Sequence, residues 1–123
     1  MFSSSLEVIL TVAYQEATSR RHTHLTLEHL LYSMTHDSEG EKILLACGGE
    51  LPKIRQALDE FLQNSLEQYH RSNQEEPKQT LAFRRVLQTA VLHVQSAGRN
   101  EVEEGDVLAA ILQQPKTYAA QLL

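Results

Sequence analysis

The sequence has little of what disulfide-linked or sheet-based folds require. Its single cysteine, Cys47, cannot close an internal disulfide, and it stands in the apolar stretch ILLAC. We therefore expect a small core residue in a reducing compartment. Five glycines and three prolines are few for 123 residues, and no window alternates polar and apolar side chains with a period of two. A β-sheet with its turns is thus excluded as the main architecture.

Basic residues and long apolar runs are also scarce. Eleven Lys and Arg stand against sixteen Asp and Glu, which gives a formal net charge of −5. This balance argues against binding to a nucleic-acid backbone. No apolar run approaches the ~20 residues that span a bilayer, and the start MFSSSLEVIL lacks the features of a signal peptide. We expect one soluble, cytoplasmic domain with neither nucleic acid nor membrane as a partner.

Apolar residues recur instead at helical spacing, which predicts an all-α fold. Gly48 and Gly49 are expected to end the third helix, Gly98 the fifth, and Pro115 to break the sixth. The fourth helix is expected to reach about Tyr69. Capping boxes, single N-caps and a first-turn proline mark where helices begin: Ser4 with Glu7, Thr26, Ser38 with Glu41, Pro52 and Thr80.

The chain is predicted to consist of two repeats. The stretch RSNQEEPKQ at residues 71–79 contains no apolar residue, so we expect a solvated connector between residues 1–70 and 80–123. A shift of 77 positions aligns the apolar residues of two helices and the loop between them without a gap, from Leu6 on Phe83 to Met34 on Ile111. The last residues, TYAAQLL, then correspond to the third helix. The counterpart of the fourth helix is absent from the chain.

Two segments carry a resemblance to a known family. The stretches TLAFRRVLQTAVLHVQSAGRNEV (Thr80 to Val102) and RRHTHLTLEHLL (Arg20 to Leu31) closely resemble the N-terminal Clp repeat domain of ClpA, an AAA+ unfoldase that feeds the ClpP peptidase. The resemblance covers essentially the whole chain. It implies two four-helix repeats, here without the last helix, that dock the adaptor ClpS and some protein substrates. ClpP would be reached only through ATPase rings outside this chain, and the isolated domain is expected to be a monomer.

The resemblance also implies protein-binding residues. In ClpA-type domains the adaptor lies against the starts of the second and fifth helices, and the matching positions are Glu28, Thr80 and Arg85. Thr23 and Thr89 stand where relatives carry an acid and a base, so we expect a weaker adaptor complex. Each matching residue also has a purely structural interpretation: Thr80 as an N-cap, Glu28 at a helix start, and Arg85 as a solvated cation.

The residues themselves predict a binding module without catalytic or cofactor sites. No glycine begins the G-x-x-x-x-G-K-[ST] string that cradles phosphates, and no signature of an activated nucleophile surrounds Cys47 or a serine. His22, His24, Glu28 and His29, with His93 from the second repeat, are acceptable zinc ligands, although we favour a structural role for them. Two alternatives to the docking module remain: a free-standing regulator that sequesters the adaptor, and a metal-binding helical protein.

Overall fold

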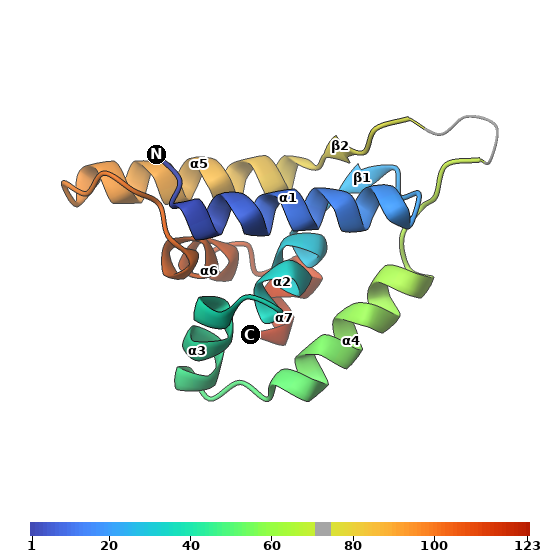
Figure 1. Cartoon of the computed structure of the whole chain (residues 1–123), viewed down its shortest axis with the longest axis horizontal. Helices are drawn as coiled ribbons and strands as arrows, with labels where there is room; N and C mark the ends of the chain where they lie inside the picture. The colour runs from blue at the N-terminus through green and yellow to red at the C-terminus, as the bar shows by residue number, and fades with distance from the viewer. Residues whose placement is uncertain (71–74) are drawn as a thin grey trace.

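The computed structural model describes residues 1–70 and 75–123, and its main elements are helices (Figure 1). The all-α fold predicted from the sequence is confirmed. In chain order the described elements are α1 (Ser4–Ser19), β1 (His24–Leu25), α2 (Leu27–Thr35), α3 (Ser38–Ala46), α4 (Leu51–Asn64), β2 (Lys78–Gln79), α5 (Leu81–Ser96), α6 (Glu104–Leu112) and α7 (Tyr118–Leu122).

The two halves of the chain are structural repeats, as the shift of 77 predicted. Helices α1 and α5 have 16 residues each, and α2 and α6 have nine each, with both pairs offset by that same shift. Aligned core positions are buried in both halves, for example Leu6 with Phe83 and Ile9 with Val86. The division of the chain at residues 70 and 80 stays a prediction.

Short strand pairs link one repeat to the other. Strand β1 pairs in parallel with β2, and the bridge between Phe2 and Val102 is the same contact with the repeats exchanged. The N–H of Thr80 donates to the carbonyl of Leu25 at 3.1 Å, while the N–H of Ser3 donates to that of Val102 at 2.9 Å. The start of each long helix is therefore fixed by the other half of the chain.

The core surrounds the two nine-residue helices. In α2, every residue except Tyr32 is buried, because α1, α3, α4 and α7 all pack around it. In α6, Val107, Leu108 and Ile111 fill the corresponding space below α5 (Figure 1). A helix that is covered on nearly all sides holds its neighbours in place, so α2 determines where α1, α4 and α7 lie.

The observed helix starts confirm three predicted signals and correct two. Thr26 and Thr80 cap α2 and α5, and Pro52 lies in the first turn of α4. Helix α1 begins after Ser3 rather than Ser4, because hydrogen bonding to the Val102 carbonyl holds Ser3 extended, as an N-cap must be.

The cap of α3 is also one residue earlier than predicted. Asp37, not Ser38, is the N-cap, and its carboxylate accepts a hydrogen bond from the N–H of Gly40 at 2.9 Å. An ionised carboxylate also interacts favourably with the positive end of the helix dipole. The predicted ends are confirmed at Gly48 and Gly98, which have φ values of 85° and 73°, a conformation that favours glycine.

Two predictions about the C-terminal ends of α3 and α4 were wrong. Cys47 is exposed, because it is the C-cap of α3 and only Leu44 and Gly40 of that helix are buried. Helix α4 ends at Asn64 rather than near Tyr69, since the following segment pairs with the α1–β1 turn, where the N–H of Tyr69 donates to the carbonyl of Arg21 at 2.7 Å.

The connector predicted at residues 71–79 is described only in part. Residues 71–74 lie outside the described residues, but β2 belongs to the folded structure because it pairs with β1. Pro77 is buried beside it, whereas Glu75 and Glu76 are exposed, as predicted. None of the helices in the described ranges is both long and apolar enough to cross a membrane.

Candidate protein-docking surface

The starts of α2 and α5 meet at the β1–β2 pair. Thr26 caps α2 and Thr80 caps α5, where its hydroxyl accepts a hydrogen bond from the N–H of Phe83 at 3.1 Å. Both threonines line one open hollow of about 360 Å³, together with Thr23, His24, Leu66 and Glu67. Two helix N-termini thus share one depression, with the positive ends of both dipoles beside it.

Glu28 is held inside the molecule. Its side chain is 7% exposed, and its Oε2 accepts a hydrogen bond from the N–H of Ala119, at the start of α7, at 2.8 Å. Helix α7 is thereby tied to α2 across 91 positions of sequence. Glu28, one of the three predicted docking residues, therefore has a structural role in the fold.

Arg85 is exposed on the second turn of α5. Arg84 beside it and Lys78 in β2 are exposed as well, and none of the three makes an ion pair within the described ranges. A chain with a net charge of −5 therefore carries a basic surface at the start of α5. The fold brings Thr80 and Arg85 onto the same end of one helix, while Glu28 lies below the surface of the neighbouring helix.

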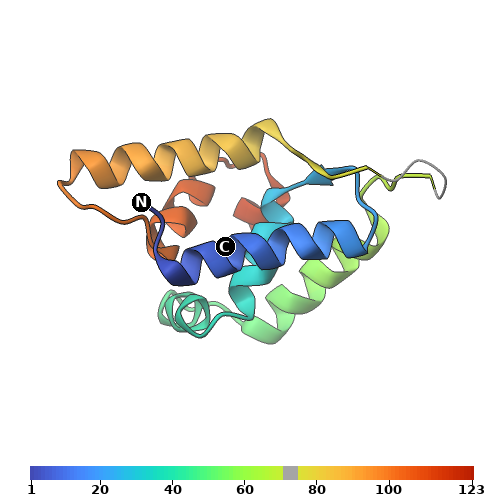
Figure 2. The same ribbon diagram turned by 45° about the horizontal axis from the view of Figure 1, so that its top comes forward.

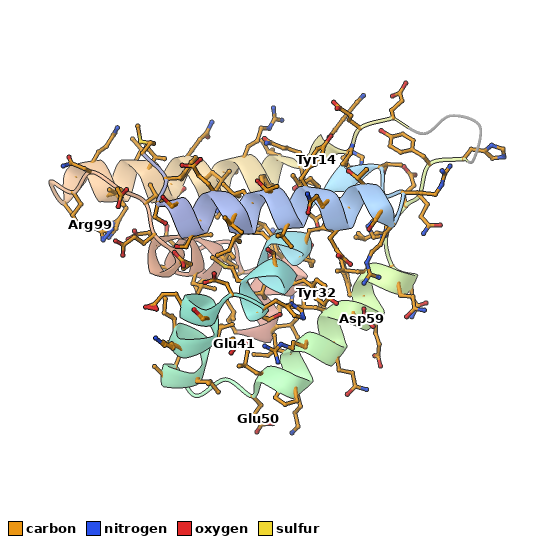
Figure 3. All side chains as sticks on the ribbon, viewed as in Figure 1. Tyr14, Tyr32, Glu41, Glu50, Asp59 and Arg99 are labelled. Carbon is orange, nitrogen blue, oxygen red and sulfur yellow. The ribbon has the colours of Figure 1, made fainter. Side chains whose placement is uncertain are left out.

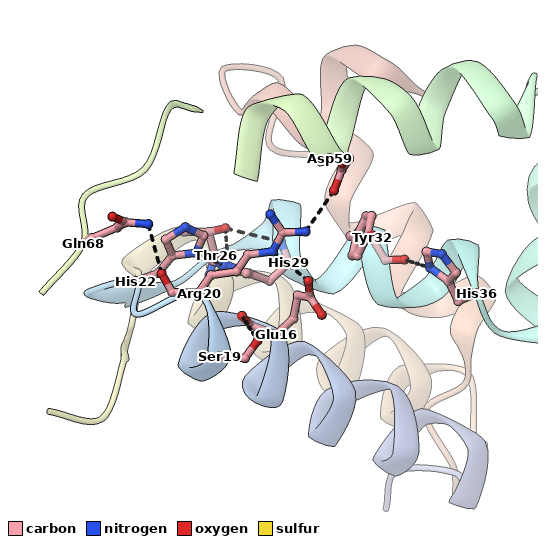
Figure 4. A network of polar contacts seen from close by, with 10 residues as sticks. All are labelled: Glu16, Ser19, Arg20, His22, Thr26, His29, Tyr32, His36, Asp59 and Gln68. Atoms are coloured by element: carbon pink, nitrogen blue, oxygen red, sulfur yellow. Dashed lines mark hydrogen bonds and ion pairs between the residues drawn. The ribbon is translucent and has the colours of Figure 1, made fainter. Parts of the chain in front are cut away.

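A pair of buried histidines supports the start of α2 from beneath. The N–H of Thr26 donates to Nδ1 of His29 at 3.0 Å, so the proton of the neutral imidazole must lie on Nε2. This Nε2 lies 2.8 Å from Nδ1 of His22, to which it then donates (Figure 4). Burial lowers the pKa of His22, while burial and the neighbouring His22 and Arg20 lower the pKa of His29 to about 3.

Arg20 closes the same network on its outer side. Its guanidinium contacts the carboxylate of Glu16 in α1 at 2.7 Å and that of Asp59 in α4 at 2.9 Å (Figure 4). It also lies over the ring of Tyr32, 5.7 Å from the ring centre. The histidine pair therefore faces a cation that is already neutralised by two carboxylates, and the whole network joins α1, α2 and α4.

The residues considered above as acceptable zinc ligands do not converge. His22 and His29 bond to each other, His24 is exposed with its Nδ1 2.8 Å from the hydroxyl of Thr23, and Glu28 faces α7. Across residues 1–70 and 75–123, no group of three or more histidine, cysteine or carboxylate side chains is placed to hold a metal ion. The geometry thus gives no support to the metal-binding alternative.

An apolar groove that the sequence reasoning did not locate lies between α1 and α5. One hollow of about 400 Å³ has walls from both helices, including Leu10, Tyr14 and Leu87. A second hollow of about 430 Å³ continues along α5 between Phe2 and Val91. Tyr14 lies on the side of α1 that faces α5 (Figure 3). The sequence carries leucine at both equivalent positions, 10 and 87, but these residues follow the same helical period as the core.

Comparison with known proteins agrees with this architecture. Residues 1–123 match the family described as the Clp repeat (R) N-terminal domain. A ClpA homolog protein of Fuscovulum blasticum is 37% identical over 123 residues, which covers 99% of this chain and 16% of that protein. The chain thus spans only a small part of the length of the relative that it matches.

Solved structures share the fold at low identity. The Hsp104 N-terminal domain of Candida albicans superposes with a TM-score of 0.78 at 14% identity, covering 98% of this chain and 85% of that one. A chain from a structural study of a malarial protein secretion system has a TM-score of 0.78 at 14% identity, covering 91% and 76%. With the family match over its whole length, this chain belongs to the family of Clp repeat (R) N-terminal domains.

Proposed function

We propose that the chain is the adaptor and substrate docking module of a ClpA-like ATP-dependent unfoldase, in which it performs no catalysis itself. The observation that supports this most is the junction of α2 and α5. The two helix starts that the family resemblance names are joined there by the β1–β2 pair and share one open hollow. The module would act in the cytoplasm, and ClpP would be reached only through ATPase rings beyond this chain.

The adaptor in this proposal is ClpS, and the three predicted residues have unequal roles. Arg85 supplies an exposed charge that orients the partner. Thr80 shapes the hollow and keeps α5 capped, and Glu28 acts mainly by holding α7 against α2. A docked adaptor would raise the effective concentration of its substrate near the ATPase pore without new contacts at the pore.

Calorimetry with purified ClpS tests the proposal. We expect Arg85→Glu to weaken binding by about 1–3 kcal/mol, because repulsion replaces attraction at the interface. Arg84→Glu is the matched control, since it makes the same change of charge one residue away, on the groove side of α5. Equal affinities for the Arg85→Glu variant and the unmodified chain, with the helical circular dichroism intact, would remove Arg85 from the interface.

The sequestering regulator remains the alternative, and a degradation assay separates the two. When the chain is added in excess to ClpA, ClpP, ClpS and an adaptor-dependent substrate, competition for ClpS slows degradation under either proposal. Fusion of the chain to ATPase rings that lack their own N-domain distinguishes them. A docking module restores delivery by the adaptor, whereas a regulator that acts only by sequestration does not.

The apolar groove between α1 and α5 supports a second docking role, direct binding of unfolded segments. Two adjoining apolar hollows on one face are large enough to take several side chains of an extended chain. We expect Val91→Asp to abolish binding of an apolar reporter peptide, because a charge would replace a half-buried wall residue. The affinity for ClpS should stay unchanged, since Val91 lies more than two turns from the start of α5.

A further inference from the structure

The hydroxyl of Tyr14 connects the apolar groove to the segment that precedes β2. The ring of Tyr14 is half-buried and lines the hollow of about 400 Å³ between α1 and α5. Its hydroxyl donates a hydrogen bond to the carboxylate of Glu76, two residues before β2. Burial and this neighbouring carboxylate raise the pKa of the phenol, so the hydroxyl keeps its proton and remains a donor. A carboxylate from outside the two helices therefore contacts the wall of the groove.

The backbone that carries Glu76 is held on both sides. Its carbonyl accepts a hydrogen bond from the hydroxyl of Tyr69 at 3.2 Å. Pro77, the next residue, is buried, and the N–H of Lys78 donates to the carbonyl of Thr23 at 3.0 Å. Figure 2 shows the chain that enters β2 beside the end of α1 and the start of α5. The fold therefore fixes the backbone from which the carboxylate reaches the groove.

The charge of Glu76 is not matched by a neighbouring cation. The residues that line the two hollows are all uncharged, and Arg84, on the groove side of α5, lines neither hollow. Glu76 is exposed and forms no ion pair within the described ranges, although the exposed Lys78 lies only two residues further on. A hydrogen bond from a neutral phenol leaves the carboxylate an anion. The group that contacts the groove wall at Tyr14 is thus an anion without a paired cation.

We propose that Glu76 selects the segments that the groove accepts, provided that the groove docks substrate as proposed above. The occupant is an extended apolar segment with a lysine or arginine directly beside its apolar residues, and this cation lies against the Glu76 carboxylate. The apolar side chains enter the hollows and supply most of the affinity. A basic neighbour adds attraction, whereas an acidic neighbour meets repulsion. Tyr14 is a positioning residue, because its hydroxyl holds the carboxylate at the groove wall.

Capped peptides with one apolar centre test the proposal by displacing a labelled peptide that has the same centre. Three peptides differ only in the two residues that flank this centre, which are both lysine, both glutamine or both glutamate. We expect the lysine peptide to bind about two- to fivefold more tightly than the glutamine peptide, and the glutamate peptide more weakly by a similar factor. These differences should shrink at high salt, because ions screen exposed charges. Equal affinities of the three peptides at low salt would overturn the proposal.

Substitutions in the connector test whether the preference comes from this carboxylate. Glu76→Gln keeps an acceptor for the Tyr14 hydroxyl but removes the charge, so the three peptides should bind within about twofold of one another. Glu76→Lys should reverse their order. Glu75→Gln is the matched control, because it removes the same charge from the exposed residue next to Glu76, and it should leave the preference for lysine in place. A preference for lysine that persists in the Glu76→Gln variant would overturn the proposal.

Tyr14→Phe tests the positioning role, because it keeps the ring in the hollow and removes the hydroxyl that holds Glu76. We expect the glutamine peptide to bind as before, while the advantage of the lysine peptide falls to about twofold or less. An unchanged advantage would contradict the role of Tyr14. If even the glutamine peptide fails to bind the unmodified chain, the docking role of the groove fails as a whole. A glutamine peptide that binds, without any effect of charge, leaves that role intact and overturns this inference alone.

Discussion

Acidification should destabilise this protein through the buried histidine pair. Nδ1 of His29 accepts the N–H of Thr26, so a proton added to this nitrogen breaks that hydrogen bond. Burial, with His22 and Arg20 beside it, lowers the pKa of His29 to about 3. An unfolded histidine has a pKa of about 6.5. The unfolded chain therefore binds more protons, and stability that is present above about pH 6.5 is lost as the pH falls toward about 3.

The size of the effect follows from the two pKa values. Between about pH 7 and about pH 4.5, the unfolded His29 becomes protonated while the folded one stays neutral, which costs about 2.5 kcal/mol of unfolding free energy. His22 acts in the same direction, because burial lowers its pKa too. Glu104 acts in the opposite direction, because burial raises its pKa. The pH dependence of the unfolding free energy therefore includes contributions from several groups. The contribution of His29 must be measured by comparison with a variant that lacks it.

We would measure urea unfolding by circular dichroism at several pH values, for the unmodified chain and for a His29→Gln variant. The difference between their unfolding free energies gives the contribution of His29. Glutamine can accept from Thr26 and donate to His22 but does not titrate. We expect the unmodified chain to lose about 2.5 kcal/mol more than the variant between about pH 7 and about pH 4.5. Parallel pH profiles for the two proteins would refute this account, as would an imidazole signal of His29 that titrates near the ordinary histidine pKa.

Three further predictions concern stability and reactivity. Glu28→Ala should cost about 1–3 kcal/mol of unfolding free energy and speed exchange of the Ala119 amide, because that N–H loses its acceptor; unchanged exchange would argue against it. Gly40→Ala should cost about 1–3 kcal/mol of unfolding free energy in thermal unfolding, because its Cβ would clash with the carbonyl oxygen of Met34. The control Gly105→Ala meets only ordinary contacts, so its unfolding free energy should change by less than about 1 kcal/mol. Cys47 should react stoichiometrically with a thiol reagent in the folded protein, and protection until denaturation would contradict its exposure.

Local signals in the sequence predicted most of the fold because most helix starts depend on residues within one turn. Thr26 and Thr80 bond to backbone groups three residues away, a distance that a sequence pattern contains. The N-cap of α1 is Ser3 and not the predicted Ser4, because a backbone contact with Val102, far along the chain, determines where this helix begins. The short strand pairs have the same origin, and two-residue strands leave no period that a pattern could detect.

The candidate site was less predictable because its decisive contacts are long-range. Nothing near Glu28 in the sequence indicates that its carboxylate receives the N–H of Ala119. The histidines are acceptable zinc ligands by residue type, but Nδ1 of His22 and both ring nitrogens of His29 are engaged in hydrogen bonds with each other and with Thr26. The groove was missed since half-buried residues such as Leu10 and Leu87 follow the same period as the core.

The repeat itself separates residues that the fold needs from residues that it does not. Thr80 has a counterpart in Ser3, and both cap a long helix, so the capping role accounts for Thr80 whether or not it touches a partner. Arg85 corresponds to Val8, and both positions are exposed on equivalent helices. Because the first repeat folds with valine there, the fold does not require a cation at this position. Arg85 is thus an exposed charge that has no counterpart in the first repeat, and the proposed adaptor site requires such a charge.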